Sequence, residues 1–562
     1  AQVGCAPAAV PIQTSPSGPG TAAVDEGANK TLVLAQLNAL VLGAWGGAST
    51  VGGGFALIGV HSTGLSTLDG QGNRVARIAA ELPSLSNGSI MVLPDGRMSM
   101  TWHLRPDVTW QDGTPFTADD VVFSHQALID IPPGGTDLNY LVQQVEAPDP
   151  HTVTMTWKTP YYDALALDQR NFYLIPKHLL SKAYTDNKEN RDAFLSDPYF
   201  STAFVNLGPF RLQDWALGQQ ATFERYPGYF LGLPKVGKIV IQVIPDQNAL
   251  AAALRAGTVD IVPQMALSAP LSLVLRDEWQ ASGEGIIADH QANWWGLWFQ
   301  WDSQWARPPE VPRDRRLRAG LYEAIDRKTL QEFVYPGVAN TNSDSLVPAY
   351  DPRAAVAGQP FARYAYDPDK AVRDLIEAGW SRTAEGRLLD RAGNPVQLEI
   401  KAAQVFGPPM AVVADQWRKI GIDAQEMIAP PFSGPNAANS QFTGVQLQGR
   451  GAAEGVFPVF DSRLIASAAN SYTGVNTNNY ANPGLDRLID QLYGTLDATE
   501  RGPILKQMGE LMADDLGALP TYWLINFLEL RKSVRGPLAD DFRNGDPLGY
   551  NTSRNAHLWE HA

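Results

Sequence analysis

The stretch from Met98 to Ser124 reads M-S-M-T-W-H-L-R-P-D-V-T-W-Q-D-G-T-P-F-T-A-D-D-V-V-F-S. It follows Pro94-Asp95-Gly96, a turn sequence with an apolar run on either side, so we expect an antiparallel hairpin of residues 91–93 and 98–104. Farther along, Thr117 precedes Asp120 by three residues and opens an apolar run, the pattern of a capping box at a helix start. The stretch therefore predicts a strand pair followed by a helix.

Strand and helix patterns alternate along the rest of the chain. Within residues 314–333, Leu317, Leu321 and Ile325 recur every four residues, which is the spacing of one helix face. Because the two kinds of element alternate, we predict an α/β fold rather than a helical bundle or a β-sandwich. The other predicted elements are helices at 367–379, at 410–419 and from Asn482-Pro483 onward, and strands at 32–34 and 422–428.

Seven blocks of this sequence, taken in order, resemble family 5 of the extracellular solute-binding proteins, the dipeptide and oligopeptide receptors of ABC importers. Residues 100–124 resemble the signature block of that family. The other blocks are Ile175–His178, Gly208–Phe210 with Trp215, Leu254–Ile261, Arg315–Arg318 with Ala324–Arg327, Tyr366–Ala371, and Trp417–Ile422. The resemblance extends from Asn29 to the C-terminus.

This resemblance implies the two-lobed periplasmic-binding-protein fold, in which hinge strands join two α/β lobes and the ligand is enclosed as the hinge closes. The implied divisions are a flexible linker at 1–28, lobe one at 29–292 and 523–562 with an extra subdomain at about 67–205, and lobe two at 293–522. The implied partners are a peptide ligand and the transmembrane subunits of an ABC permease, which recognise the closed, monomeric protein.

Composition excludes several other classes of protein. The chain has 562 residues, with 44 basic and 59 acidic side chains and a net charge of −15, so it lacks the basic balance of a nucleic-acid-binding protein. Its single cysteine excludes a disulfide framework and any site built from several cysteines. We expect no cofactor and no metal.

The N-terminal segment has the composition of an exported, tethered protein. Residue 1 is Ala rather than Met, and residues 1–28 are rich in Pro, Gly, Ala, Ser and Thr, which is typical of a linker. Cys5, the only cysteine, resembles the acylated cysteine of a bacterial lipoprotein; an ordinary exposed thiol is the alternative. Residues 31–60 contain no charge, but their seven glycines argue against a membrane span.

In peptide-binding members of the family, an acidic residue of lobe two pairs with the ammonium group of the ligand. Counting back from Pro458 within residues 446–458, the resemblance implies Glu454 for this role. Arg450 could hold a carboxylate through two parallel hydrogen bonds. The alternative for Glu454 is a solvated acid in a loop, and the alternative for Arg450 is an ordinary surface arginine.

Tryptophans gather where the resemblance places the entry of the chain into lobe two. Five of the fifteen lie in the twelve residues from 294 to 305. Side chains alternate between the faces of a strand, so Trp294 and Trp298 share a face with Gln300, while Trp295 lies on the other. We expect the face with Gln300 to line the cleft; burial of both faces in the core is the alternative.

We expect lobe one to line the cleft with Trp45 and Asn38, which follow the first predicted strand. Open indole faces could stack on sugar rings or hold apolar peptide side chains. Binding of an oligosaccharide by the same fold is therefore the second hypothesis, after binding of a di- or oligopeptide.

An enzyme is a remote third hypothesis, in the form of a secreted hydrolase. The sequence contains no phosphate-binding loop, no zinc-binding His-Glu-x-x-His and no Gly-x-Ser-x-Gly elbow. Asp119 and Asp120 are adjacent on a predicted helix and so cannot flank one glycosidic bond. The sequence thus favours a binding protein without catalytic residues.

Overall fold

The structure is a computed structural model. It describes residues 26–38, 40, 42, 54–69, 73–131, 141–169, 171–339, 341, 343–429, 437–451, 453–537 and 552–562. The predicted linker, with Cys5, lies almost wholly outside these residues, although Glu26–Asn29 form a 3-10 turn at its end.

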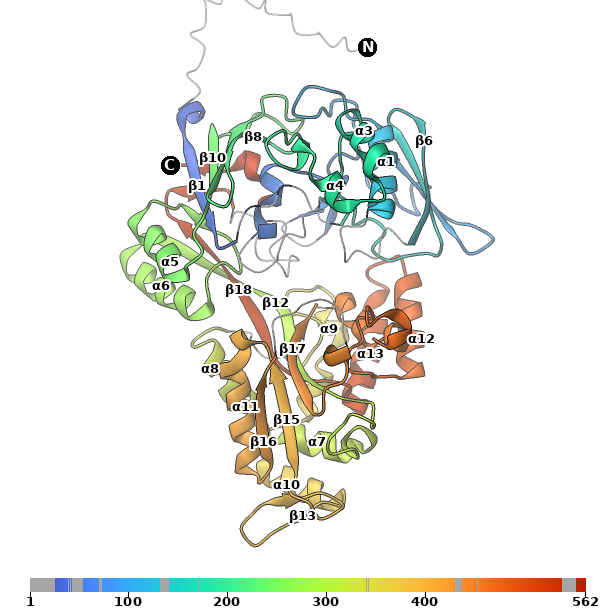
Figure 1. The fold of residues 1–562 in the computed structure, drawn as a ribbon, viewed down its shortest axis with the longest axis vertical. Helices are drawn as coiled ribbons and strands as arrows, with labels where there is room; N and C mark the ends of the chain where they lie inside the picture. Colours follow the sequence, from blue (N-terminus) through green and yellow to red (C-terminus); the bar gives the residue numbers. More distant parts are fainter. Residues whose placement is uncertain are drawn as a thin grey trace, which may run out of the picture.

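A ten-stranded mixed sheet runs through the molecule and joins its two lobes (Figure 1). The order of its strands is β16 (Asp423–Ile428), β15 (Gln397–Ala402), β17 (Val445–Arg450), β12 (Gly285–Phe299), β18 (Leu519–Arg531), β11 (Ile261–Val262), β1 (Thr31–Gln36), β10 (Lys238–Val243), β9 (Gln220–Arg225) and β8 (Phe210–Ala216). The central pair, β12 and β18, is antiparallel from Gly285 opposite Arg531 to Leu297 opposite Leu519. These two long strands cross from one lobe to the other, as the resemblance implies for hinge strands.

Lobe one carries β1 and its neighbours, a second sheet and several helices. The second sheet has four strands in the order β4 (Ile90–Val92), β5 (Met98–His103), β7 (Thr152–Trp157) and β6 (Val142–Asp149). The helices of lobe one are α1 (Ala118–Asp130), α3 (Lys177–Asn187), α4 (Arg191–Leu195), α5 (Gln247–Ala256) and α6 (Ala269–Ser282). The C-terminal residues return to this lobe, where β20 (Glu560–His561) pairs with β19 (Val534–Arg535).

Lobe two surrounds its part of the sheet with helices. They are α7 (Arg315–Glu323), α8 (Arg327–Val334), α9 (Ala354–Ala357), α10 (Pro368–Glu377), α11 (Gly407–Lys419), α12 (Pro483–Gly494) and α13 (Arg501–Asp515). Separate hydrophobic cores fill the two lobes. The mixed α/β architecture is therefore confirmed, while the residue boundaries of the lobes remain a prediction.

The predicted hairpin and capping box are confirmed. β4 pairs with β5 in antiparallel register, with Ile90 opposite Met100. At the start of α1 the Thr117 and Asp120 side chains accept reciprocal backbone hydrogen bonds, and the Asp120 carboxylate also accepts one from the Lys177 backbone at 3.0 Å. Burial dominates the environment of this carboxyl and raises its pKa. The motif thus connects α1 to α3.

The single helix face predicted over 314–333 is divided between two helices. Asp326 accepts a hydrogen bond from the Thr329 backbone at 3.0 Å and so caps a new helix, α8. Its own backbone N–H donates to the Gln416 side chain of α11 at 2.9 Å. A capping aspartate within an otherwise continuous apolar pattern therefore ends one helix and begins the next.

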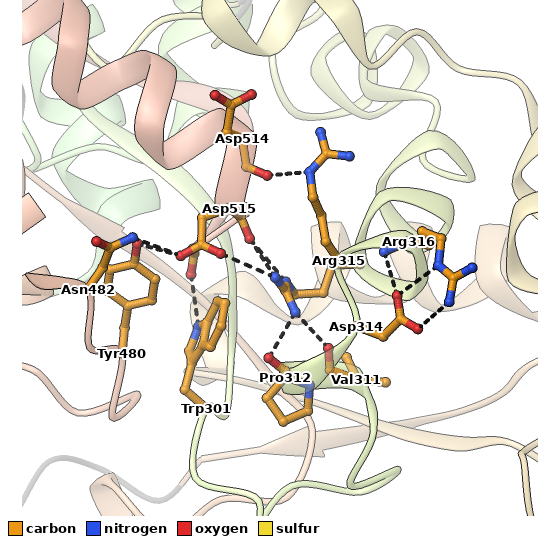
Figure 2. A network of polar contacts seen from close by, with 12 residues as sticks. Trp301, Val311, Pro312, Asp314, Arg315, Arg316, Tyr480, Asn482, Asp514 and Asp515 are labelled. Atoms are coloured by element: carbon orange, nitrogen blue, oxygen red, sulfur yellow. Dashed lines mark hydrogen bonds and ion pairs between the residues drawn. The ribbon is translucent and has the colours of Figure 1, made fainter. Parts of the chain in front are cut away.

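A buried arginine fixes the part of lobe two nearest α13. Arg318 on α7 donates to the carbonyls of Val311 and Pro312, both at 2.9 Å, and to that of Asp515 at 2.8 Å. The Asp515 carboxylate in turn accepts a hydrogen bond from the Tyr480 hydroxyl at 2.8 Å, and Figure 2 shows Tyr480 and Asn482 beside Asp515. Loss of hydration by burial lowers the pKa of Arg318 to about 10, so the guanidinium remains charged at neutral pH.

In the part of the chain that the structure describes, no helix is long and apolar enough to span a membrane.

Candidate functional site at the lobe junction

The ends of several strands meet where β12 and β18 cross between the lobes. β17 runs antiparallel to β12, so its last residue, Arg450, lies opposite Trp294. β15 is parallel to β17, and β16 is parallel to β15 with Ile428 opposite Ala402. The carboxyl ends of these three lobe-two strands therefore share one edge, which we call the junction edge.

The first strand of lobe one ends on the other side of the same junction. β1 is parallel to β11, which is antiparallel to β18 with Ile261 opposite Leu530. β1 therefore runs toward the junction and ends there at Gln36, two residues before Asn38. Ligands of open α/β sheets bind beyond the carboxyl ends of the strands, so this junction is the candidate site.

Trp295 is the aromatic residue of β12 that lies beside the junction edge. Its ring is 3.7 Å from that of Phe406, centroid to centroid, and it stacks on Tyr522 at 6.3 Å. Among the described residues its indole N–H has no hydrogen-bond partner, although the residue is only 8% exposed. Buried donors are normally paired, so this N–H is a candidate ligand contact; the indole N–H of the neighbouring Trp294 is also buried without a partner among the described residues.

Gly449 makes room for Trp295 from the neighbouring strand. The two residues face each other in the β12–β17 ladder. A Cβ atom on Gly449 would lie 2.4 Å from two atoms of the Trp295 ring, which is a severe overlap. The sequence Leu447-Gln448-Gly449 therefore determines where the indole lies.

Trp294 and Trp298 lie on the opposite face and are buried. Their rings stack at 5.4 Å, and Trp298 stacks in turn on Phe460 at 4.7 Å. The Trp298 indole donates to the Gln448 carbonyl at 3.2 Å. The structure thus places these two tryptophans in the core of lobe two, contrary to our expectation that their face lines the cleft.

Gln300 is likewise part of the interior, and its amide is fully used. Its Nε2 donates to the carbonyls of Ser440 and Phe442 at 2.8 and 3.1 Å. Its Oε1 accepts from the Asp302 backbone and the Asn479 side chain, both at 2.9 Å. With four hydrogen bonds and 1% exposure, Gln300 has no group left to offer a ligand.

The remaining predicted site residues are placed only in part. Asn38 is exposed two residues after the end of β1, and its carbonyl accepts a hydrogen bond from the Gln36 side chain at 2.8 Å. Arg450 ends β17 and Glu454 lies in the 3-10 segment η9 (Ala453–Phe460), but their side chains are outside the described part. Trp45 lies outside the described residues altogether. Ligand contact by any of these residues remains a prediction.

An apolar rim at the junction edge escaped the sequence analysis. Val405, in the 3-10 turn η7 (Gln404–Phe406) just after β15, is 72% exposed, and Ile428 at the end of β16 is 43% exposed. A Cβ atom added to Gly407 would lie 3.6 Å from the Ile428 side chain, so the segment after β15 adjoins the end of β16. Only Ile428 carried a signal in the sequence, because it ends the strand predicted at 422–428, whereas no strand was predicted before Val405.

The described residues at the junction have little capacity to hold a metal. In the described ranges no three His, Cys, Asp or Glu side chains cluster as metal ligands would. Burial raises the pKa of Tyr522 well above its ordinary value, so this neighbour of Trp295 stays protonated. The described rim residues, Val405 and Ile428, are apolar, and the neighbouring Trp295 and Phe406 are aromatic.

Comparison with known proteins identifies the family. Residues 92–482 match the family described as "Bacterial extracellular solute-binding proteins, family 5 Middle". The chain belongs to this family. Members are solute-binding proteins of ABC transporters that act outside the cytoplasm.

Individual relatives of this family 5 protein bind different solutes. The oligopeptide-binding protein AppA of Bacillus subtilis strain 168 is 24% identical over 463 residues, which cover 79% of this chain and 78% of AppA. The oligopeptide-binding protein of Thermus thermophilus, complexed with a pentapeptide, has a TM-score of 0.70 at 22% identity and covers 93% and 95% of the two chains. NikZ from Campylobacter jejuni, in complex with Ni(L-His), has a TM-score of 0.69 at 21% identity, with coverages of 94% and 99%. These structures show the shared fold and leave the solute open.

Proposed function

We propose that this protein captures a short peptide between its two lobes and delivers it to an ABC permease. The observation that carries the proposal is the junction edge, where the exposed apolar rim adjoins the unpaired indole N–H of Trp295. A peptide offers both kinds of partner, since it carries apolar side chains and hydrogen-bonding amide groups. The similarity to the oligopeptide-binding protein AppA, which spans 79% of this chain and 78% of AppA, supports the same class of ligand.

Within this proposal Trp295 and Phe406 form a wall for the ligand, and Trp295 donates to a ligand carbonyl. Glu454 remains the proposed partner of the peptide ammonium group, and Arg450 a proposed partner of a carboxylate. Both assignments rest on the family resemblance and on their place at or just after the end of β17. Asn38 and Trp45 are proposed contacts from lobe one.

Binding of an oligosaccharide loses its main support in the structure. That hypothesis rested on open indole faces, but Trp294 and Trp298 are 0% and 1% exposed and are covered by other rings. A nickel chelate, as bound by NikZ, has no cluster of ligating side chains to favour it among the described residues. A short peptide therefore remains the ligand that we propose.

Delivery requires that the protein stay near the membrane that holds its permease. Cys5 is the proposed lipid-attachment residue, because it begins a linker of flexible composition. Mass spectrometry of the protein isolated from its natural source would detect acyl chains on Cys5. A free thiol on the mature protein would contradict this part of the proposal.

The test of the peptide itself is a thermal-shift screen of ligand-stripped protein. We expect pentapeptides with apolar side chains to stabilise it by about 2.7 kcal/mol at 100 times the dissociation constant. N-acetylation should abolish the shift if Glu454 pairs with the ammonium group. Stabilisation by oligosaccharides alone would refute the proposal.

A further inference from the structure

A second contact joins the lobes at a distance from the hinge strands. Tyr162, five residues after β7 of lobe one, donates its backbone N–H to the carbonyl of Tyr493 on α12 of lobe two at 2.9 Å. Their rings stack with centroids 5.5 Å apart and planes 23° apart. Figure 1 shows α12 and α13 beneath the part of lobe one that carries α1 and β6, on the other side of the view from β18.

Three further side chains complete this contact. Tyr161 meets the Tyr493 ring edge-on at 5.9 Å and stacks on Trp157 of β7 at 6.0 Å. Arg501 at the start of α13 lies 5.2 Å from the Tyr162 ring centroid, and its NH1 donates to the carbonyls of Thr495 and Leu496, both at 3.1 Å. We call the group formed by Tyr161, Tyr162, Tyr493, Leu496 and Arg501 the clasp.

The clasp is anchored in both hydrophobic cores. Tyr493 packs against the core of lobe two, whereas Leu496, three residues later, packs against the core of lobe one. Arg501 is only 9% exposed, so its contact with Tyr162 is shielded from water. Aromatic stacking and cation–π contacts are stronger when water is excluded.

We propose that the clasp holds the two lobes closed in the absence of ligand. Its contacts join residues of different lobes, so hinge opening about β12 and β18 must break them. When a protein binds its ligand in only one conformation, the apparent affinity equals the intrinsic affinity multiplied by the populated fraction of that conformation. Stabilising the closed form in advance therefore tightens binding, whatever the solute.

The test measures the distance between the lobes without ligand. In a Cys5→Ser background, spin labels are placed at Lys182→Cys on α3 and Lys506→Cys on α13, two exposed positions on different lobes. Double electron–electron resonance then reports the closed and open populations. Replacement of Tyr493 by Ala is expected to lower the closed-to-open ratio about tenfold, since it removes both ring contacts across the lobes.

Matched variants separate the clasp from a general loss of stability. Tyr493→Phe keeps the ring and should behave like the parent, as should Tyr366→Ala, which removes a 48% exposed tyrosine elsewhere in lobe two. Tyr162→Ala should open the protein as Tyr493→Ala does, and the double variant should add little more. All variants are first checked for a native thermal transition.

Two results would overturn the inference. One is a distance distribution in Tyr493→Ala that equals that of the parent. The other is a parent that is wholly open without ligand. Neither depends on which solute binds, so failure of the peptide proposal would leave this test intact.

Discussion

Gly449 of β17 lies directly opposite Trp295 of β12, and a Cβ atom added to Gly449 would stand 2.4 Å from the indole ring. Replacing Gly449 by Ala should therefore displace the Trp295 ring from its present position. Overpacking of this kind costs about 1–3 kcal/mol of folding stability. Because the ring also loses its place beside the ligand, we expect the peptide affinity to fall by about tenfold. Isothermal titration calorimetry measures the change.

Gly494→Ala is the matched control for this substitution. A Cβ atom there meets nothing within 4 Å, and the residue lies at the end of α12. We expect its affinity to equal that of the parent. Equal affinities for the parent, Gly449→Ala and Gly494→Ala would show that the position of Trp295 does not matter to the ligand.

The tryptophans of β12 should divide into one that binds and others that hold the core. Trp295→Phe removes the unpaired indole N–H and should weaken peptide binding while stability changes little. Trp298→Ala should instead lower the free energy of unfolding by about 3–5 kcal/mol, because it leaves a cavity beneath Phe460. Chemical denaturation and calorimetry on both variants test the division, and the reverse pattern would contradict it.

Arg318 should be indispensable to lobe two, in contrast to its neighbour Arg316. Arg318→Met leaves the carbonyls of Val311, Pro312 and Asp515 without their donor, and we expect a loss of stability on the order of 3 kcal/mol. Arg316, whose side chain is 59% exposed, pairs with Asp314 at the surface, so Arg316→Met should cost less than about 1 kcal/mol. Equal melting temperatures for the two variants would disprove this assignment.

Stability should fall with rising pH because of Glu529 in the hinge strand β18. Burial raises the pKa of this carboxyl from 4.5 to about 8, although the Ser272 hydroxyl donates to it at 2.6 Å. Between these two values the folded protein holds a proton that the unfolded chain has released. Over this pH range Glu529 alone should therefore lower the free energy of unfolding by about 1.4 kcal/mol for each pH unit.

Glu529→Gln has no titrating proton and should remove this contribution. The comparison is the difference in unfolding free energy between parent and variant, measured by urea denaturation from pH 5 to pH 8. A difference that stays constant with pH would show that Glu529 is ionised in the folded protein.

Local patterns in the sequence predicted the elements of the fold well, because their causes are local. The turn at Pro94-Asp95-Gly96, the capping box at Thr117 and the cap at Asp367 each act within a few residues. Only the helix expected over 314–333 was divided, because the Asp326 side chain caps a new helix at Thr329, three residues on, within the apolar spacing that had suggested one helix. Gln416, ninety residues away, accepts a hydrogen bond from the Asp326 backbone.

The candidate site was harder to predict, because long-range packing decides which face of a strand is covered. Alternation correctly put Trp294 and Trp298 on one face of β12, but the segment carrying Phe460 covers that face. The register of β12 against β18 also shifts between Gln291 and Trp294, which no local pattern indicates. Trp295 emerged as the junction residue only when Gly449 and Phe406 were placed beside it.

The most direct test of peptide capture is isothermal titration of ligand-stripped protein with free-amino pentapeptides that carry apolar side chains. We predict saturable binding of one peptide per protein, weakened in Trp295→Phe and unchanged in Tyr366→Ala. An absence of binding to every such peptide, by a protein that binds a metal chelate or an oligosaccharide with one-to-one stoichiometry, would contradict the account.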